Sequence, residues 1–368
     1  MSVEGDLLHT VTADNISPAR ARTGKILVRV SAGLFLGLAL LQILFEFEVV
    51  AFGFDTWRPV FFAYLVWATM LCASQIITRG EFGKRVLFVL PAALFVVSLV
   101  VFPLLFGLYI SFTDWNLASQ DGMKFNGLDN LRQMWADEFY WNALRNMVFY
   151  VLAISVEYVI AFGLALLLNA QIRARKFFRV VFLLPLMLSP VAVSWMVGKS
   201  MLEVRFGPIA RLAREFGWDR PSFFGSPEIA RFMIMAMDAW TFIPFMMIML
   251  LAGLQALPKE VIEASKVDGA KAWQTFWEVI FPLMLPVTVT AVLIRIIFKL
   301  KLADIIINVT SGGPGGATDS VTSFIFREYR DRSNVGYGTL LAMVYLVLIV
   351  ISITVFLKTV NRWLERPQ

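Results

Sequence analysis

The sequence has little of what soluble enzymes and secreted scaffolds depend on. Its 368 residues include one cysteine, Cys72, which excludes a disulfide framework and a cysteine-based metal cluster. The single histidine, His9, lies in the polar N-terminal segment, so histidine-centred catalysis within the apolar segments is excluded. Charged residues make up only 16% of the chain, well below the share usual in soluble domains. Together these shortages point away from a soluble enzyme.

What the chain has in excess is apolar sequence. Hydrophobic residues make up 58% of it, and its mean hydropathy is +0.71. A helix that crosses a bilayer needs about 20 mostly apolar residues. We count eight such windows, over residues 27–50, 59–78, 86–110, 147–169, 178–201, 231–252, 282–307 and 337–358. The sequence therefore predicts an all-α membrane protein with eight transmembrane helices.

The polar segment 1–24 is expected to be a loose cytoplasmic tail. The apolar run that follows it has no small-residue cleavage site, and a second apolar run comes soon after. We therefore interpret the first run as a retained helix and not as a signal peptide.

The net charge of +6 is explained by the expected membrane orientation. Lysine and arginine gather beside the apolar runs, where the positive-inside rule places them in the cytoplasm, so nucleic acid is not expected as a partner. The residues on this side are Arg20, Arg22, Lys25, Arg79, Lys84, Arg85, Arg173, Arg175, Lys176, Arg179, Lys358, Arg362 and Arg366. Later outward segments also carry arginines, which blurs the bias there. An even number of spans with both termini in the cytoplasm is the consistent solution.

One polar loop separates two apolar runs in the second half of the chain. It contains the segment EASKVDGAKAWQTFWEVIFPLMLP, from Glu263 to Pro286, and is expected on the cytoplasmic side. Pro258 and Glu260 favour a helix start, and Gly269 gives backbone freedom for a turn. Residues at the 3, 4, 7 spacing of one helical face follow: Trp273, Phe276, Trp277 and Ile280. The loop is predicted to be two short helices hinged at glycine that dock on a partner protein; the alternative is an amphipathic helix lying on lipid.

This loop resembles a known motif. EAS-x3-G-x9-V-I-F-P, which begins at Glu263 and ends at Pro282, is similar to the EAA loop of permease subunits of binding-protein-dependent ABC importers. Four further stretches resemble the carbohydrate-importing branch, which includes the maltose and glycerol-phosphate systems: SFTDWN (111–116), NGLDN (126–130), WTFIPF (240–245) and VTSGGPGGAT (309–318). The resemblance covers residues 86–358, which contain six of the expected spans.

The resemblance implies an organisation in three parts. Residues 1–24 form the tail, and residues 25–80 form a two-helix N-terminal extension outside the family core. Residues 81–368 form a six-helix core like that of type I ABC importer permeases, with the EAA coupling loop at about 254–282.

In that family the EAA loop docks into an ATPase subunit and transmits its closure to the membrane helices. The resemblance assigns this coupling role to Glu263, Ala264, Ser265, Asp268, Gly269 and Pro282. It implies four kinds of partner besides the lipid bilayer: a second permease subunit, a dimer of ATPase subunits, a periplasmic or lipid-anchored binding protein, and the carbohydrate substrate that this protein delivers.

No ATP site is expected on this chain. A GKS triplet occurs at 198–200, but Val193 stands where a phosphate-binding loop needs its first glycine. ATP and magnesium would therefore belong to the partner ATPase, and neither a cofactor nor enzymatic activity is expected on this chain.

Ionisable residues within the spans are candidates for the transport path, because charge in a bilayer is costly and usually faces the bundle interior. They are Glu157, Asp238, Arg295, Lys299, Lys301 and Asp304. Arg295, Lys299 and Leu302 share one helical face, so two repelling cations need an anionic partner. That partner is Glu157, Asp238, the companion permease or the substrate. Alternatively, Lys299 lies about 26 Å along the helix from Pro282 and extends its ammonium group to the outer interface.

The resemblance also marks positions that contact sugar in maltose-type permeases. They correspond to Thr241, Phe242, Phe245, Phe298, Lys299 and Leu302, and Arg295 completes the expected substrate path. Few of these side chains offer polar contacts to a sugar. Either the companion subunit binds most of the cargo, or the cargo carries negative charge. The phenylalanines are candidates for stacking on a sugar ring, with ordinary packing as the alternative.

These features predict a permease subunit that translocates a sugar, polyol or related carbohydrate across the cytoplasmic membrane, driven by a separate ATPase. The alternative cargo is an anionic derivative such as a sugar acid or glycerol phosphate. A secondary transporter with proton sites at Glu157 and Asp238 would need an inverted repeat, which the sequence does not show. A membrane glycosyltransferase would need clustered acidic residues, and the outward acids are scattered.

Overall fold

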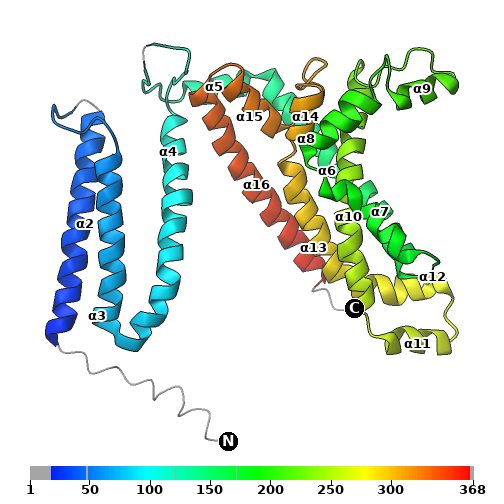
Figure 1. Cartoon of the computed structure of the whole chain (residues 1–368), viewed down its shortest axis with the longest axis horizontal. Coiled ribbons are helices and arrows are strands. Elements are labelled where there is room, and N and C mark those ends of the chain that lie inside the picture. The colour runs from blue at the N-terminus through cyan, green and yellow to red at the C-terminus, as the bar shows by residue number, and fades with distance from the viewer. Residues whose placement is uncertain (1–17, 47–48, 121, 171, 365–368) are drawn as a thin grey trace, which may run out of the picture. The chain divides into compact units, whose positions relative to one another are not determined.

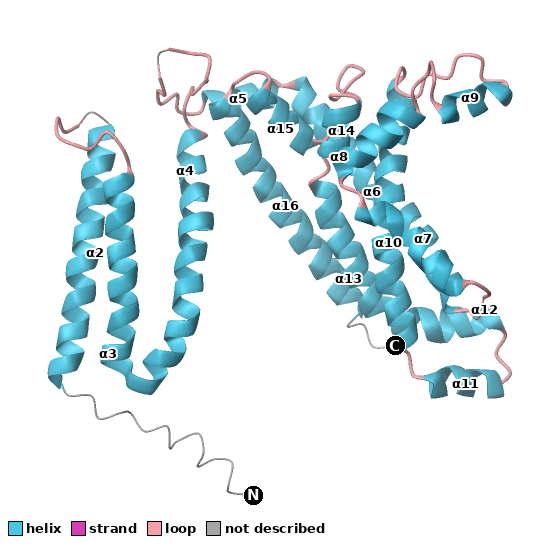
Figure 2. Cartoon of the chain, viewed as in Figure 1, coloured by secondary structure: helices cyan, strands magenta, loops and turns pink. Residues whose placement is uncertain are grey.

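The computed structural model describes residues 18–46, 49–120, 122–170 and 172–364. His9 and residues 1–17 of the expected tail lie outside the described residues. Helices account for the described architecture, and the only extended pairings within it are two isolated bridges. The chain forms two compact units, Met1–Phe106 and Gly107–Gln368. Figures 1 and 2 show that both are helical.

The first unit contains α2 (Pro18–Glu46), α3 (Arg58–Val96), the π-helical segment η1 (Val97–Val101) and the start of α4 (Phe102–Ile110). Because α2 begins at Pro18, residues 18–24 of the segment expected as tail are helical. Gly24 allows α2 to approach α3 closely, since a side chain there would lie 2.4 Å from Thr78. Its carbonyl accepts a 3.0 Å hydrogen bond from the Ser74 hydroxyl. The boundary between the two units, at 106/107, is defined by packing. The expected boundary at 80/81 is defined by likeness to the family, and it stays a prediction.

The second unit carries the remaining helices. They are α5 (Asp129–Ala136), α6 (Glu138–Asn169), α7 (Arg175–Met187), α8 (Pro190–Val193), η2 (Ser194–Met201), α9 (Pro208–Glu215), α10 (Pro227–Ala256), α11 (Lys259–Val267), α12 (Ala272–Gln274), η3 (Thr275–Ile280), α13 (Phe281–Leu300), α14 (Asp304–Val309), α15 (Val321–Arg330) and α16 (Val335–Leu364). The long helices α6, α10 and α13 pack together at the centre (Figure 1). Their facing residues form an apolar core that includes Ile154, Ala161, Leu250 and Met284.

Seven continuous helices within the described residues are long and apolar enough to cross a membrane. The expected span at 178–201 is instead a bent pair, α7 followed by α8 and η2, with 96° between its arms. The break follows from Pro190, which disfavours helical geometry at Ser189 before it. Ser189 is extended, and its hydroxyl caps the new helix by accepting a 3.2 Å hydrogen bond from the Ala192 amide. With this pair counted as one span, the predicted eight are confirmed.

The glycine-rich segment 312–316 is a tethered turn at the end of the second unit opposite α11 (Figure 1). Side chains of α6 hold it: Asn146 donates hydrogen bonds to the carbonyls of Gly316 and Asp319, and Tyr150 donates to that of Thr318 at 2.7 Å. The Asp319 carboxylate is buried, pairs with Arg327, and accepts a 3.0 Å hydrogen bond from Ser323.

Candidate functional site

Four charged side chains meet in the interior of the second unit, contributed by its three central helices. Glu157 comes from α6, Asp238 from α10, and Arg295 and Lys299 from α13. Glu157 accepts from Arg295 Nε at 2.6 Å and from Lys299 Nζ at 2.7 Å. Asp238 pairs with the same two cations. We call these residues the ionic quartet.

The quartet is sealed from solvent within this chain. The side chains of Arg295 and Lys299 are 0% exposed, and those of Glu157 and Asp238 are 3% and 2% exposed. Two carboxylates and two cations balance to zero net charge, which offsets part of the cost of removing them from water. Of the alternatives for the anionic partner, the structure shows Glu157 and Asp238. Lys299 is directed into the bundle and does not extend to the outer interface.

Aromatic rings lie directly beside the quartet. The Arg295 guanidinium carbon is 4.7 Å from the centre of the Phe242 ring, a cation–π distance. The Phe298 ring contacts Phe242 and Phe245, with centroids 5.7 and 5.4 Å away. The quartet thus contacts Phe242 through Arg295, and Phe298 links Phe242 to Phe245.

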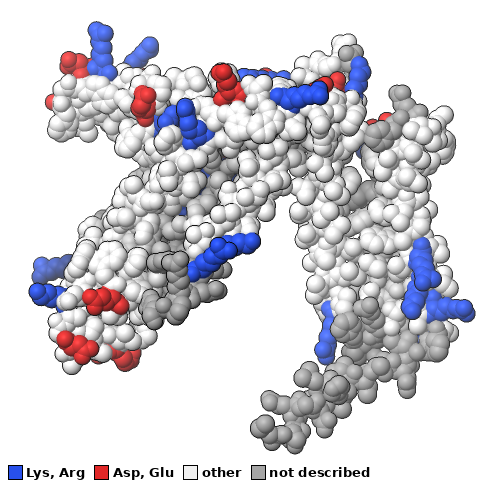
Figure 3. Space-filling view, turned by 180° about the vertical axis from the view of Figure 1, so that it is seen from behind, with Lys and Arg blue, Asp and Glu red and all other residues white. Residues whose placement is uncertain are grey.

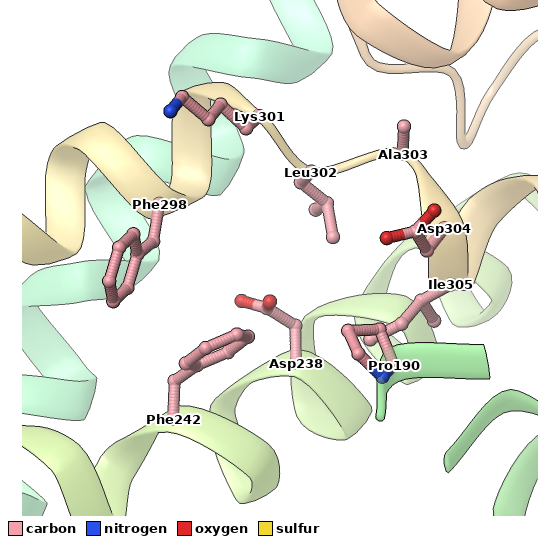
Figure 4. A pocket seen from close by; sticks show the side chains of 9 residues that line it. All are labelled: Pro190, Asp238, Phe242, Phe298, Lys301, Leu302, Ala303, Asp304 and Ile305. Atoms are coloured by element: carbon pink, nitrogen blue, oxygen red, sulfur yellow. The ribbon is translucent and has the colours of Figure 1, made fainter. Parts of the chain in front are cut away.

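A pocket of about 240 Å³ opens next to these rings. Figure 4 shows Phe242 and Phe298 on one side of it and Pro190 and Ile305 on the other, with Asp238 between them. Its remaining lining residues are Lys301, Leu302, Ala303 and Asp304. Three residues of the path implied by the resemblance, Phe242, Phe298 and Leu302, thus line one cavity together with three of the ionisable candidates, Asp238, Lys301 and Asp304.

The other expected path residues surround this pocket without lining it. Thr241 is buried, and its hydroxyl donates to the Met237 carbonyl at 2.9 Å, so it has a local partner. Arg295 and Lys299 act on the pocket through Asp238 and Phe242. Pro190 and Ile305 received no role from the sequence, because an apolar residue in an apolar run carries no distinguishing signal. The only sequence signal at Pro190 is that a proline favours a helix break there, which is the break observed after α7.

The EAA loop turns at Gly269, as predicted, but only the first of its two expected short helices is separate. α11 precedes the turn, whereas α12 and η3 after it continue directly into the spanning helix α13. Gly269 has a φ of +81°, which is strained for any other residue, and it ends the turn after α11. Glu263, Ala264 and Asp268 are exposed, and neither acid forms an ion pair among the described residues. Figure 3 shows acidic side chains gathered at this end of the unit. The loop presents charge outward without internal partners.

Another residue of the motif faces inward. Ser265 is buried; its hydroxyl donates to the Ile262 carbonyl at 2.8 Å and lies 3.3 Å from that of Thr275. This contact closes α11 onto η3. Pro282 is in the second position of α13, and the helix runs on unbroken from α12 through η3.

The aromatic residues of the loop contact one another, as expected of one face: the ring centroids of Trp273 and Phe276, Trp273 and Trp277, and Phe276 and Trp277 are 6.5, 5.5 and 5.0 Å apart. Phe276 packs edge-on against Phe162 of α6 at 5.6 Å and belongs to the core. Trp273 and Trp277 are 71% and 44% exposed. Phe276 anchors the loop, and the tryptophans remain available to a partner or to lipid.

The chain is similar to known proteins. The family described as binding-protein-dependent transport system inner membrane component matches residues 157–367. The chain is 31% identical over 273 residues to the trehalose/maltose transport system permease protein MalF of Thermococcus litoralis, covering 74% of this chain and 92% of that protein. It is 30% identical over 285 residues to the sulfoquinovosyl glycerol transport system permease protein SmoG of Agrobacterium fabrum, covering 76% and 92%.

A further relative and a solved structure agree. The sn-glycerol-3-phosphate permease protein UgpA of Agrobacterium fabrum is 32% identical over 239 residues, covering 63% of this chain and 79% of that one. A chain of a bacterial alginate ABC transporter, solved with an alginate-bound periplasmic protein, has 19% identity and a TM-score of 0.66, covering 86% of this chain and all of that one. This last likeness shows the fold. The chain belongs to the binding-protein-dependent transport system inner membrane components, and is a multi-pass permease subunit of an ABC importer of the inner membrane.

Proposed function

We propose that this permease forms one half of a membrane path for an uncharged carbohydrate. The carrying observation is the aromatic-lined pocket set against a charge-balanced quartet. Phenylalanine rings offer apolar faces for sugar rings, and Asp238 borders the pocket with its carboxylate already paired to Arg295 and Lys299. The name of MalF is consistent with a neutral glycoside cargo, whereas the sulfoquinovosyl glycerol in the name of SmoG carries a sulfonate. The pocket is smaller than the roughly 300–1,000 Å³ of drug-sized ligand sites, so it suits one sugar ring while the companion permease holds the rest.

The charge balance supports a neutral cargo over an anionic one. An anionic derivative would need unpaired cations in the path, but both interior cations are paired with two carboxylates each, although Nη1 of Arg295 has no hydrogen-bond partner. The pocket wall adds one lysine and one aspartate, Lys301 and Asp304, which also balance. This chain therefore contributes no net positive charge to attract an anion.

Energy would enter through α11 and the turn at Gly269. Exposed, unpaired acids on a loop anchored by Phe276 suit docking into a cleft of an ATPase subunit. Closure of the ATPase dimer on ATP would draw the two permease loops together, and the helices anchored to them would switch the pocket from one side of the membrane to the other. In this arrangement α11 and both chain termini lie in the cytoplasm. Cargo would arrive from a binding protein at the opposite end.

Reconstituted transport tests the proposal. The complete transporter, in vesicles loaded with ATP and magnesium, is supplied with its binding protein and radiolabelled trehalose, maltose or glycerol phosphate. We expect ATP-dependent accumulation of a neutral sugar, unaffected by a protonophore. Accumulation that follows a proton gradient without ATP would establish a secondary transporter instead. Uptake of glycerol phosphate alone would refute the neutral-cargo assignment but leave the ATP-driven mechanism standing.

A further inference from the structure

The helix α9 lies across the end of the second unit opposite α11 (Figure 1). It stands between two elements that are long and apolar enough to cross a membrane: η2, the end of the bent pair, stops at Met201, and α10 begins at Pro227. The chain thus enters α9 from the end of one span and leaves it towards the start of the next. α9 therefore lies at the level where the spans end, which is the surface of the membrane.

Contacts with the rest of the unit hold α9 in one orientation. Gly207 forms the tight turn before it, where an added side chain would lie 2.5 Å from the Glu203 carbonyl oxygen. Ala210 is 0% exposed and belongs to the apolar core. The Arg214 guanidinium donates a hydrogen bond to the Val204 carbonyl. Because the helix is fixed in this way, its sequence determines which side chains face outward.

The exposed residues of α9 form an apolar side and a charged side. Leu212 and Phe216 are four residues apart, so they lie on the same side of the helix, and they are 52% and 89% exposed. Arg214 lies midway between them in sequence, so at about 100° per residue it is about 160° around the helix from each. Arg211 is also exposed, about 100° from Leu212 and about 140° from Phe216. Charge and apolar surface are therefore separated.

The surroundings of α9 favour lipid over water or protein at the apolar side. Phe206 and Trp218, just beyond its two ends, are 65% and 39% exposed, and aromatic residues are enriched where spans meet the membrane surface. Figure 3 shows charged side chains standing out at this end of the unit, away from the spans. A soluble protein that approaches from outside would meet those charges first. The apolar side is left for the membrane.

We propose that α9 is an interfacial helix whose Leu212 and Phe216 side chains are inserted among the lipids of the membrane surface. Short amphipathic helices bind membranes in this way, with the apolar side at the boundary between headgroups and acyl chains. α9 packs on η2, so the lipid holds the end of the arm that begins at Pro190 of the pocket. The assignment to the outer leaflet rests on the proposed function, whereas contact with lipid does not.

Spin labelling of the complete transporter in lipid vesicles tests the assignment. Cys72, the single cysteine of the chain, is replaced (Cys72→Ser), and the partner subunits are made cysteine-free. A nitroxide is then attached at Leu212→Cys, at Phe216→Cys or, as the control, at Arg211→Cys. Oxygen concentrates in lipid, whereas a water-soluble nickel chelate is excluded from it. We expect the ratio of oxygen to nickel collision rates to be several-fold higher at each apolar position than at the control.

Three other results would overturn the proposal. Nickel that reaches both apolar positions as readily as the control would place this side of α9 in water. Low collision rates with both reagents would show that a protein subunit covers it. A fall in both rates on addition of the binding protein would assign it to that protein. ATPase activity stimulated by the binding protein shows that each variant is assembled. Because the collision rates are measured without transport, failure of this proposal is distinguished from failure of the transport proposal.

Discussion

The ionic quartet and the EAA loop use the same residue types in opposite ways. In the quartet, Glu157 and Asp238 are sealed in the bundle and each pairs with two cations. In the loop, Glu263 and Asp268 are exposed and form no ion pair among the described residues. A buried charge must find its partner inside the fold, whereas an exposed charge on a rigid loop is free to meet another protein. The quartet therefore positions the path, and the loop is available for coupling.

The largest effect should follow from breaking the quartet. Arg295→Met leaves two buried carboxylates with one cation, and loss of one partner of a buried pair destabilises by about 3–5 kcal/mol. We expect the variant complex to lose its folded, monodisperse form at a much lower temperature than the wild type, measured by fluorescence-detected size exclusion after heating.

The matched control is Arg295→Met combined with Glu157→Met, which removes one charge of each sign and leaves Lys299 paired with Asp238. Replacing a whole buried pair by apolar residues is often close to neutral, so most of the stability should return. If the single and double variants unfold at the same temperature, charge balance is not what stabilises this region.

Reversal of charge in the loop should instead remove function and leave stability unchanged. Glu263→Lys alters an exposed residue, so the unfolding temperature should match the wild type, while ATP-driven uptake is lost and the ATPase dissociates more readily. The control, Glu215→Lys, makes the same change on exposed α9 at the opposite end of the unit and should transport normally (Figure 1). Co-purification of ATPase and uptake in vesicles measure both effects. Normal uptake by Glu263→Lys would contradict the coupling role.

Asp319 offers a third case, a buried acid outside the spans. Burial raises its pKa from the ordinary 3.8 to about 6, although Arg327 and Ser323 lower it in part. Burial also raises the pKa of Glu328. Between about pH 4 and 6 the folded chain binds these protons more tightly than the unfolded chain, so the free energy of unfolding decreases as pH rises through that window.

We therefore expect a higher unfolding temperature at about pH 5 than at about pH 7. The difference should shrink in Asp319→Asn, which cannot ionise, and persist in Asp331→Asn, a control at an exposed acid of the same region. An unchanged pH profile in Asp319→Asn would show that this carboxyl does not set the dependence.

The smallest effect is expected in the pocket wall. Phe298→Ala removes one ring from the aromatic contact with Phe242 and Phe245. Aromatic contacts contribute about 0.5–1.5 kcal/mol, so the concentration of cargo needed for half-maximal uptake should rise about 3- to 10-fold with little change in the maximal rate. The control is Phe232→Ala. Phe232 lies on α10, the helix that carries Phe242 and Phe245, but it is 58% exposed, so its substitution should leave uptake unchanged. If both substitutions changed uptake equally, the pocket would not belong to the transport path.

Some features of the fold and the site could be predicted from the sequence, and others could not. The hinge at Gly269 and the helix start before Glu260 were predictable, because turn and cap preferences act over a few neighbouring residues. The seven continuous spans were predictable because hydropathy is a property of a local window. The contact of Phe276 with Phe162 of α6 was not, since it depends on how helices distant in sequence pack. The pocket lining from α8 and α14 was also unpredictable, because it requires segments distant in sequence to meet.

The sequence by itself determined that this protein is a membrane permease with a hinged polar loop. The length of each apolar run, the charges that flank it and the long loop motif are all properties of short stretches of sequence. Only the tertiary structure decided which carboxylates pair with Arg295 and Lys299. Glu157 lies 138 residues from Arg295, and Asp238 lies 57 from it, on different helices. Their meeting depends on how α6, α10 and α13 rotate about their own axes as they pack. That rotation is set by the fit of side chains between helices, which no single stretch of sequence contains.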